Sequence, residues 1–256
     1  MTDSALQGQL ESIADWLFDS QSAIAFTGAG ISTESGIPDF RSPGGVWSKN
    51  RTVYFNEFLS SEADRYEYWR QKSQTHVEFE AASPNAAHRV LAEWETEGKL
   101  SAVVTQNIDG LHVEAGSHNV LELHGTAREI SCLSCEKRWP ADPWVQKYLE
   151  EDRVPNCPDC KGLLKHATVS FGQALPEDVL ERSITLASNA DLCFACGSSL
   201  VVYPAAGIPE VAKRNGGKLV IINRTETPLD HLADVIIREP LGSTLSQIHQ
   251  FYMDRC

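Results

Sequence analysis

Several features are missing from this sequence of 256 residues, and each absence excludes a class of protein. There is no run of 18 apolar residues, the minimum that a membrane-spanning helix would need. The first 18 residues are acidic and amphipathic, without the basic start and small-residue cleavage site of a signal peptide. Internal repeats and low-complexity tracts are absent as well. We therefore expect an intracellular, cytoplasmic protein with no membrane partner.

Basic residues are also few, with 22 Lys and Arg against 35 Asp and Glu, for a net charge of -13. Nonspecific binding to nucleic acid requires a cationic surface, so we expect no direct nucleic-acid partner. An acidic surface suits a basic, lysine-bearing partner, and it equally suits a protein that is simply kept soluble by its charge. The composition, 42% hydrophobic and 22% charged, is that of an ordinary globular protein.

Short apolar runs alternate with helical patterns along most of the chain. We predict helices at 4–20, 86–98 and 177–188, and strands at 23–27, 101–105, 168–171, 191–196, 218–223 and 234–238. Buried strands that alternate with helices indicate an α/β fold, a Rossmann-like doubly wound parallel sheet. The segments 43–85 and 131–165 break this rhythm. We assign them to a smaller inserted zinc-binding and helical module, which leaves 1–42, 86–130 and 166–256 for the main domain.

The stretch 28–32, Gly-Ala-Gly-Ile-Ser, joins a predicted strand to a predicted helix. Gly28 and Gly30 permit a sharp turn and a close approach of the backbone, and a helix that begins near Ser32 would direct free N–H groups at the loop. The stretch lacks the Gly-Lys-Ser/Thr ending of a P-loop and the third glycine of the standard dinucleotide fingerprint. A glycine pair also occurs in simple tight turns, but its place after a buried strand favours a dinucleotide site.

Residues 36–41, Gly-Ile-Pro-Asp-Phe-Arg, follow closely, and they place the opposite charges of Asp39 and Arg41 beside Phe40. This pattern is typical of a salt-bridged turn. It is equally typical of a loop that closes over a nucleotide, with Phe40 as a lid and Arg41 facing a phosphate or a ribose.

Polar residues follow the strand 101–105 directly: Gln106, Asn107 and Asp109. Open α/β sheets bind ligands at the carboxyl ends of their strands, although Asn and Asp are also common in turns. His124 likewise ends an apolar run, and the ordinary pKa of histidine, near 6.5, suits a general base at neutral pH. We interpret His88, His112 and His231 as packing or surface residues.

Six of the seven cysteines form three C-x-x-C pairs. Two pairs separated by 21 residues predict a tetrahedral Cys₄ zinc site, which has no open coordination position and is therefore structural. Its ligands would be Cys132, Cys135, Cys157 and Cys160. The third pair lies in the predicted strand 191–196. Side chains three apart in a strand point to opposite faces, so we interpret Cys193 and Cys196 as small buried hydrophobic residues.

Taken together in chain order, these residues resemble the sirtuin family over nearly the whole sequence. The stretches that look like family motifs are 28–32 and 36–41 (first nucleotide motif), 105–112 (second), 124–125 (catalytic histidine), 197–199 with 204–206 (phosphate and ribose) and 222–223 (adenosine side). The four cysteines stand where that family places its zinc.

The resemblance implies an enzyme that uses NAD as a co-substrate to deacylate lysine side chains of proteins or peptides, most often acetyl-lysine. Nicotinamide and O-acyl-ADP-ribose would be released. His124 would be the base, with Asn107 and Asp109 orienting the ribose and the nicotinamide. The other NAD contacts implied by the resemblance are Gly28, Ala29, Gly30, Ser32, Ile37, Asp39, Phe40, Arg41, Gln106, Ile108, Gly197, Ser198, Ser199, Asn223 and Val235. Val169, Phe171 and Gly172 would pair with the backbone of the substrate.

The sequence departs from the family pattern in 165–176, where Lys165-His166 and Gln173 replace the usual Arg-Pro and the Glu of Phe-Gly-Glu. The segment 66–72 has no clean Tyr-x-x-Arg pair, so we expect neutral acyl groups. Alternative functions on the same fold are mono-ADP-ribosyl transfer and NAD hydrolysis, although His124 favours deacylation. A non-catalytic zinc-ribbon module on a nucleotide sensor and a hydride-transferring dehydrogenase are further alternatives.

Overall fold

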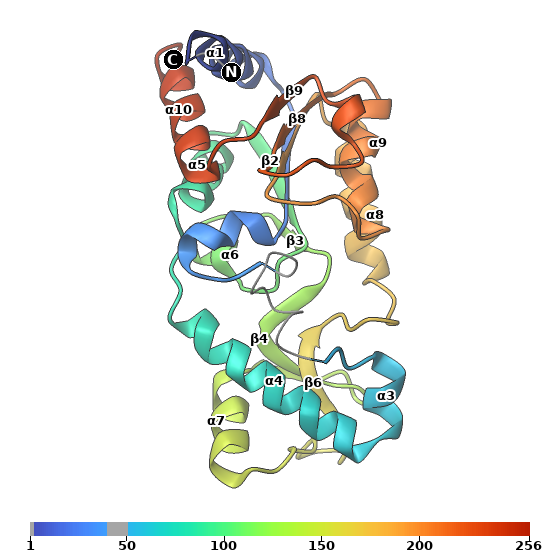
Figure 1. Cartoon of the computed structure of the whole chain (residues 1–256). Coiled ribbons are helices and arrows are strands. Elements are labelled where there is room, and N and C mark those ends of the chain that lie inside the picture. The colour runs from blue at the N-terminus through green and yellow to red at the C-terminus, as the bar shows by residue number, and fades with distance from the viewer. Residues whose placement is uncertain (1–2, 40–50) are drawn as a thin grey trace.

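The computed structural model describes residues 3–39 and 51–256. A six-stranded sheet with its helices forms one end of the molecule, and a three-stranded sheet with the helices α3, α4 and α7 forms the other (Figure 1). Phe40 and Arg41 lie outside the described residues, so the proposed lid stays a prediction. No helix in the described ranges combines the length and the apolarity that a membrane crossing needs.

The large sheet is entirely parallel, with the strand order β3-β2-β1-β7-β8-β9. Its strands are β1 (Ala23–Thr27), β2 (Leu100–Thr105), β3 (Val120–Glu122), β7 (Leu192–Cys196), β8 (Lys218–Ile222) and β9 (Val235–Ile237). The chain builds outward from β1 in one direction and from β7 in the other. The strand order therefore reverses between β1 and β7, at the point where such sheets bind their ligands.

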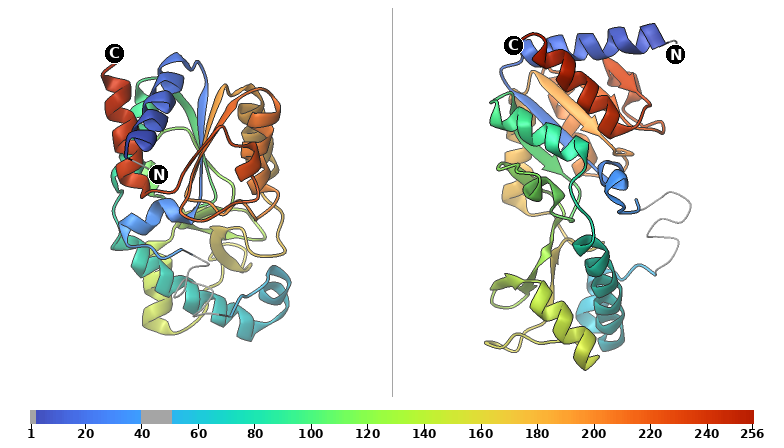
Figure 2. Two further views of the ribbon diagram at one scale, coloured as in Figure 1. Left: turned by 45° about the horizontal axis from the view of Figure 1, so that its top comes forward. Right: turned by 90° about the vertical axis from the view of Figure 1, so that its left-hand side faces the viewer.

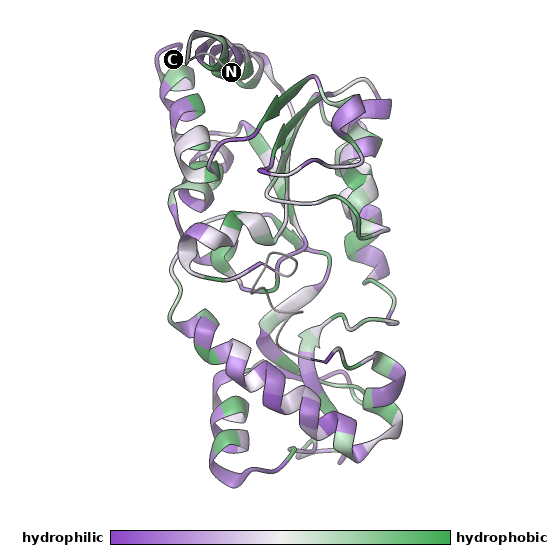
Figure 3. Cartoon of the chain, viewed as in Figure 1, coloured by the Kyte–Doolittle hydropathy of each residue, from purple (hydrophilic) through white to green (hydrophobic). Residues whose placement is uncertain are grey.

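Both faces of this sheet are covered, which confirms the predicted doubly wound fold. Residues of β1 alternate between two hydrophobic clusters, with Ala23 and Ala25 in one and Ile24 and Phe26 in the other. The helices α1 (Asp3–Asp19), α5 (Ala86–Thr96) and α10 (Leu241–Met253) cover the first face, and α8 (Glu177–Asn189) and α9 (Ile208–Arg214) cover the second (Figures 1 and 2). The strands between them are strongly hydrophobic (Figure 3). The predicted helices 4–20, 86–98 and 177–188 thus correspond to α1, α5 and α8.

The third cysteine pair lies in β7 as predicted. Cys193 packs into the cluster on one face of the sheet and Cys196 into the cluster on the other. Both side chains are buried and neither forms a disulfide. The structure therefore confirms the interpretation of these cysteines as core residues.

The smaller sheet is antiparallel, with the order β5-β4-β6. Its strands are β4 (Gly125–Cys132), β5 (Arg138–Pro140) and β6 (Leu164–Thr168), and its helices are α3 (Phe55–Ser60), α4 (Glu62–Glu80) and α7 (Asp142–Glu151). These elements share a separate hydrophobic cluster that includes Trp69 and Tyr148. The Trp69 indole donates a hydrogen bond of 3.0 Å to Leu164 O and so fixes α4 on β6.

One predicted strand is wrong. We expected a strand at 168–171 in the parallel sheet, whereas β6 ends at Thr168 and belongs to the antiparallel sheet. Beyond Thr168 the Val169 N–H donates to His124 O at 2.8 Å, which continues the pairing with β4 by one bond, and the chain then turns at residues 171–172. The sequence did not indicate a strand at β6 because Lys165 and His166, which are usually exposed residue types, are buried within it.

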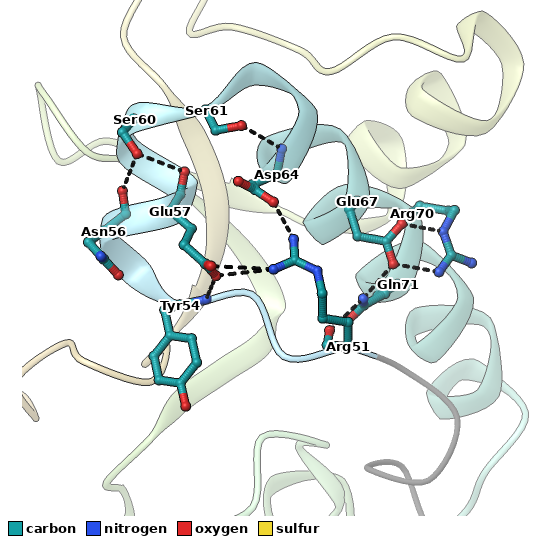
Figure 4. Close-up of polar contacts among 10 residues, drawn as sticks. All are labelled: Arg51, Tyr54, Asn56, Glu57, Ser60, Ser61, Asp64, Glu67, Arg70 and Gln71. Carbon is teal, nitrogen blue, oxygen red and sulfur yellow. Dashed lines mark hydrogen bonds and ion pairs between the residues drawn. The ribbon is translucent and has the colours of Figure 1, made fainter.

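The described chain resumes beside α3 and α4, where Arg51 connects the two helices (Figure 4). Its guanidinium contacts Asp64 on α4 and lies 3.4 Å from both carboxylate oxygens of Glu57 on α3. The Gln71 side chain holds Arg51 O at 2.8 Å. Arg51 therefore anchors this segment through both its side chain and its backbone.

Short elements complete the fold. They are the 3₁₀ helices η1 (Ala29–Ser35), η2 (Ala205–Gly207) and η3 (Asp230–Leu232), and the single turn α6 (Leu111–Glu114). The helix that we expected near Ser32 begins earlier, at Ala29, and is of the 3₁₀ type. It is followed by Gly36, whose φ of 86° lies in the left-handed region that glycine adopts without strain.

Candidate active site

Two glycine loops meet at the point where the strand order reverses. Gly28 N donates to Cys196 O at 3.0 Å, and Gly30 N donates to Gly197 O at 2.8 Å. A Cβ on Gly30 would lie only 2.7 Å from Gly197 Cα, and a Cβ on Gly197 only 2.4 Å from Ile31 N. The glycines are thus required first for the contact between the loops after β1 and β7. This contact brings the backbones of the two loops together at the carboxyl edge of the sheet.

Three buried polar side chains lie beside these loops. The Ser32 hydroxyl donates to Asp109 Oδ2 at 2.7 Å and accepts from Asn107 Nδ2 at 3.1 Å. Asp109 Oδ1 accepts from Leu111 N at 3.0 Å, which fixes the carboxylate in place. The structure thus brings together residues from the loop after β1 and the loop after β2, all of them at most 6% exposed. Such a preorganised cluster can orient a polar ligand at the sheet edge.

Gln106 connects this cluster to the loop after β7. Its side-chain amide donates to the Ser198 hydroxyl at 2.8 Å, and that hydroxyl also accepts from Leu200 N at 3.2 Å. The residues after β1, β2 and β7 therefore share one continuous hydrogen-bonded surface.

His124 is half-buried at the end of the next strand, β3. Its Nδ1 lies 2.9 Å from Gln106 O. A carbonyl oxygen only accepts, so Nδ1 carries the hydrogen in this contact and the lone pair of the neutral ring is on Nε2. Burial lowers the pKa of His124 from its ordinary 6.5, against the opposing effect of the bond to Gln106. A neutral imidazole with a free lone pair at neutral pH is what a general base requires.

Gly125 holds the backbone of the neighbouring His124 in place. Its φ is 69°, and a Cβ there would lie 2.0 Å from Ala167 O. Only glycine fits where β4 crosses β6 so closely. The backbone that carries His124 is thus held at the junction of the two sheets.

Other predicted NAD contacts lie at different depths around this edge. Ile37 is buried and, with the partly buried Ile108, packs against the cluster formed by Phe79, Ala82, Leu111 and Ala127. Asn223 follows β8, and its side chain donates to Thr225 O at 2.8 Å. Val235 begins β9 and packs against the hydrophobic core, so its side chain does not join the polar cluster. Ala29, Asp39 and Ser199 lie in the same loops as the residues above.

The predicted substrate contacts Val169, Phe171 and Gly172 follow β6 as a loop. Phe171 is 46% exposed, and its ring lies 6.1 Å from that of Tyr54. Its carbonyl already accepts from Phe55 N at 2.9 Å. Gln173 closes the turn, because its side-chain oxygen accepts from Ser170 N at 3.2 Å. A glutamate would accept the same bond, so the departure from the family pattern keeps this geometry.

Sequence reasoning missed two residues of this site. The Arg128 side chain donates to Asp109 O at 2.7 Å and packs against Gly110, and so supports the polar cluster from behind. Burial, with the nearby charges of Asp109 and Glu129, raises the pKa of Glu122 to about 7. The only available signal for Glu122 was a carboxylate two residues before His124 at a strand end.

The histidines that we interpreted as packing or surface residues lie in such positions. His88 and His112 are buried with their rings 4.8 Å apart, and the Nε2 of His112 lies 2.9 Å from the Thr27 hydroxyl. His231 is exposed. None of the three belongs to the polar cluster around Asn107.

The four cysteines of the first two pairs form one cluster, with all sulfur atoms within 4.8 Å of one another. The Cys132–Cys160 and Cys135–Cys157 sulfur pairs are 3.4 and 3.8 Å apart. Zn–S bonds of about 2.3 Å in a tetrahedron place sulfurs about 3.8 Å apart, so the four thiols fit zinc. A side chain at Gly162 would collide with Ser134 and Cys132, which shows how closely the turn after Cys157 and Cys160 packs against the first cysteine pair. With four thiolate ligands the metal would hold the module together and leave no position for a substrate.

Comparison with known proteins places this arrangement in a family. The family model described as "Sir2 family" matches residues 28–204, and the chain is 46% identical over 244 residues to NAD-dependent protein deacetylase 1 of Bradyrhizobium diazoefficiens. That alignment covers 94% of this chain and 96% of the relative. The chain belongs to the Sir2 family. The NAD-dependent protein deacetylase of Thermotoga maritima is also similar to this Sir2-family chain, at 45% identity over 88% of the chain and 91% of the relative.

Solved Sir2 structures have the same fold. A Sir2–p53 peptide–NAD+ complex superposes with a TM-score of 0.86 at 41% identity and covers 94% of this chain and 97% of its own. A structure of Sir2Tm bound to a propionylated peptide gives a TM-score of 0.85 at 40% identity, over 94% and 98% of the two chains.

Proposed function

We propose that this Sir2-family chain is an NAD-dependent protein-lysine deacylase that acts mainly on acetyl-lysine and releases nicotinamide and O-acyl-ADP-ribose. The observation that carries the proposal is the bond of His124 to Gln106 O, together with the bond of the Gln106 side chain to Ser198, at the edge where the strand order reverses. The relatives named as NAD-dependent protein deacetylases, and the Sir2 complex with peptide and NAD+, support it.

His124 would act as the general base. Its Nδ1–H is held by Gln106 O, which directs the lone pair of Nε2 away from that carbonyl and leaves it available to accept a proton. Because burial lowers its pKa, the ring stays neutral at physiological pH. A base in this state favours deacylation over simple NAD hydrolysis or ADP-ribosyl transfer, since those reactions do not require a second attack by a ribose hydroxyl.

NAD would be held by the loops after β1, β2, β7 and β8. When bound, it supplies a glycosidic bond that is already activated by the positive charge of nicotinamide. The loop after β1 lies where the strand order reverses, at the edge where such sheets bind a pyrophosphate, and Ser32, Asn107 and Asp109 can orient a ribose and an amide. The remaining roles assigned above, including those of Phe40, Arg41 and Val235, belong to the same proposal.

The peptide would bind beside the loop after β6. An exposed aromatic ring, Phe171, lies there next to Tyr54, and the loop begins at the backbone bond between Val169 and His124. We propose that Val169, Phe171 and Gly172 contact the substrate. The absence of a Tyr-x-x-Arg pair in 66–72 favours neutral acyl groups.

The division of the chain belongs to the proposal as well. Segments 1–42, 86–130 and 166–256 would form the NAD-binding domain, and 43–85 with 131–165 the helical and zinc-ribbon module. The separate hydrophobic cluster around Trp69 supports this division. A reducing compartment such as the cytoplasm would keep the four zinc ligands as thiolates.

The test is mass spectrometry of a reaction that contains the protein, NAD and an acetyl-lysine peptide. We expect deacetylated peptide, nicotinamide and O-acetyl-ADP-ribose in equal amounts, all of them lost in His124→Ala. The matched control, His231→Ala, changes an exposed histidine outside the site and should keep full activity.

Consumption of NAD without deacylation, with longer and acidic acyl groups included, would overturn the proposal in favour of hydrolysis or ADP-ribosyl transfer. NAD binding without any turnover would favour a sensor. Absorbance at the reduced-nicotinamide band would instead indicate a dehydrogenase.

A further inference from the structure

A second group of side chains of metal-ligating types lies between helices α4 and α7. It consists of His76 and Glu80, one turn apart on α4, and Asp142, the first residue of α7. One ligand atom from each residue lies within 4.8 Å of the others. The two helices pack against each other at the end of the molecule away from the parallel sheet (Figure 1).

His76 is unusual because its imidazole ring is buried although neither ring nitrogen forms a hydrogen bond within the described residues. The residue is only 3% exposed, and within residues 3–39 and 51–256 neither ring nitrogen has a hydrogen-bond partner. Its Nε2 nevertheless lies 3.0 Å from Asp142 Oδ1 and 3.7 Å from Glu80 Oε1, close to both but not aligned for a hydrogen bond. A buried polar atom without a hydrogen-bond partner is destabilising. The lone pair of His76 Nε2 therefore requires a further partner.

The spacing of these atoms fits a small transition-metal ion. Zinc bonds to nitrogen and oxygen are about 2.0–2.2 Å long, so two ligands of a tetrahedral ion lie about 3.4 Å apart. The two distances from Nε2 lie on either side of this value. Imidazole is a poor ligand for Ca²⁺ or Mg²⁺, whereas an imidazole with two carboxylates suits Zn²⁺.

Access to the site is open from the carboxylate side. The side chains of Glu80 and Asp142 are 50% and 66% exposed, so an ion can enter from solvent while the imidazole holds it from within. We propose that His76, Glu80 and Asp142 form a second zinc site, with water as the fourth ligand. It would clamp α7 onto the end of α4, just before the chain returns to α5 and the parallel sheet.

The experiment is equilibrium dialysis of the full-length, untagged protein against buffered free Zn²⁺, followed by measurement of zinc per chain. All proteins carry Cys256→Ser, because the thiol of Cys256 is exposed and would itself bind zinc. We expect two zinc ions per chain, one of them in the Cys₄ cluster. In Asp142→Asn and in His76→Ala, affinity for the second ion should fall at least about tenfold.

The controls separate this site from nonspecific binding and from misfolding. Glu78→Gln removes an exposed carboxylate from the same helix and should leave the second affinity unchanged. Asp142→Asn is conservative and exposed, so it remains informative if His76→Ala fails to fold. One zinc per chain at every free Zn²⁺ concentration would overturn the proposal and leave only an ion pair. Retention of the second ion by Asp142→Asn would overturn it as well.

Discussion

Lys165 should make the stability of this protein strongly dependent on pH. Its side chain lies in β6, is only 1% exposed, and donates to the backbone carbonyls of His166 and Thr168. Burial, with a smaller contribution from the charge of Lys72, lowers the pKa of Lys165 from 10.5 to about 7. The unfolded chain therefore binds this proton more tightly than the folded chain does, and between pH 7 and 10.5 stability rises with pH.

The size of the effect follows from the two pKa values. At pH 7 roughly half of the folded chains carry a protonated Lys165, and at pH 9 roughly one in a hundred, whereas the unfolded chain stays protonated throughout. Integration at about 1.4 kcal/mol per proton per pH unit gives a rise of about 2 kcal/mol in the free energy of unfolding between pH 7 and 9. Lys165→Met should lack this rise. The substitution also leaves the two carbonyls without their donor. At pH 7 this loss should lower the free energy of unfolding by about 1–3 kcal/mol for each carbonyl.

The assay is urea unfolding of the wild type and Lys165→Met at pH 7, 8 and 9, with zinc present throughout. The informative quantity is the difference between the two proteins at each pH, because titrating groups that do not interact with Lys165 cancel in it. Lys147→Met, an exposed lysine on α7, is the matched control and should follow the wild type. If the stability of Lys165→Met and of the wild type changes with pH in parallel, the inferred lowering of the Lys165 pKa by burial is wrong.

Three further predictions concern the site and the zinc module. His124→Ala should lower kcat/KM for deacylation by about 10²–10⁴. In the wild type kcat/KM should be constant at neutral pH and fall only as pH drops through a pKa below 6.5, because protonation removes the base; a midpoint above 6.5 would contradict the inferred burial effect. Gly30→Ala should lower the free energy of unfolding by about 1–3 kcal/mol through collision with Gly197, whereas Gly8→Ala, where nothing lies within 4 Å, should be neutral or stabilising; equal effects in thermal unfolding would refute the role of the close contact. Removal of zinc with a chelator should expose the four cluster thiols to a thiol reagent and loosen the core around Trp69, visible as altered tryptophan fluorescence; an unchanged spectrum would argue against a structural metal.

The sequence predicted the glycine loop correctly as a feature of the sheet edge, but not the main reason for its glycines. From the sequence, we interpreted Gly28 and Gly30 as residues that let the backbone approach a phosphate. In the structure they also meet Gly197, which lies 167 positions after Gly30 in the chain. A contact between two loops depends on which strands are neighbours, and the order of strands does not follow from periodicity alone.

The small module was the part least accessible to sequence reasoning. The buried face of α4 includes Ser73 and His76 among aromatic residues. Apolar and polar residues are therefore not clearly separated between the two faces of this helix. β6 buries a lysine and a histidine, and for that reason its boundary was misplaced. The cysteine pairs, in contrast, were predictable because metal geometry depends only on ligand type and spacing.

The crossing at Gly125 has a consequence for how such proteins can be recombined. His124, the proposed base, precedes the first strand of the small module, and its carbonyl accepts from Val169 N, directly after that module's last strand. A zinc module taken from another protein could therefore not be grafted in as an independent cassette. It would have to reproduce the spacing between Gly125 and Ala167, or it would tilt the imidazole away from the reacting groups.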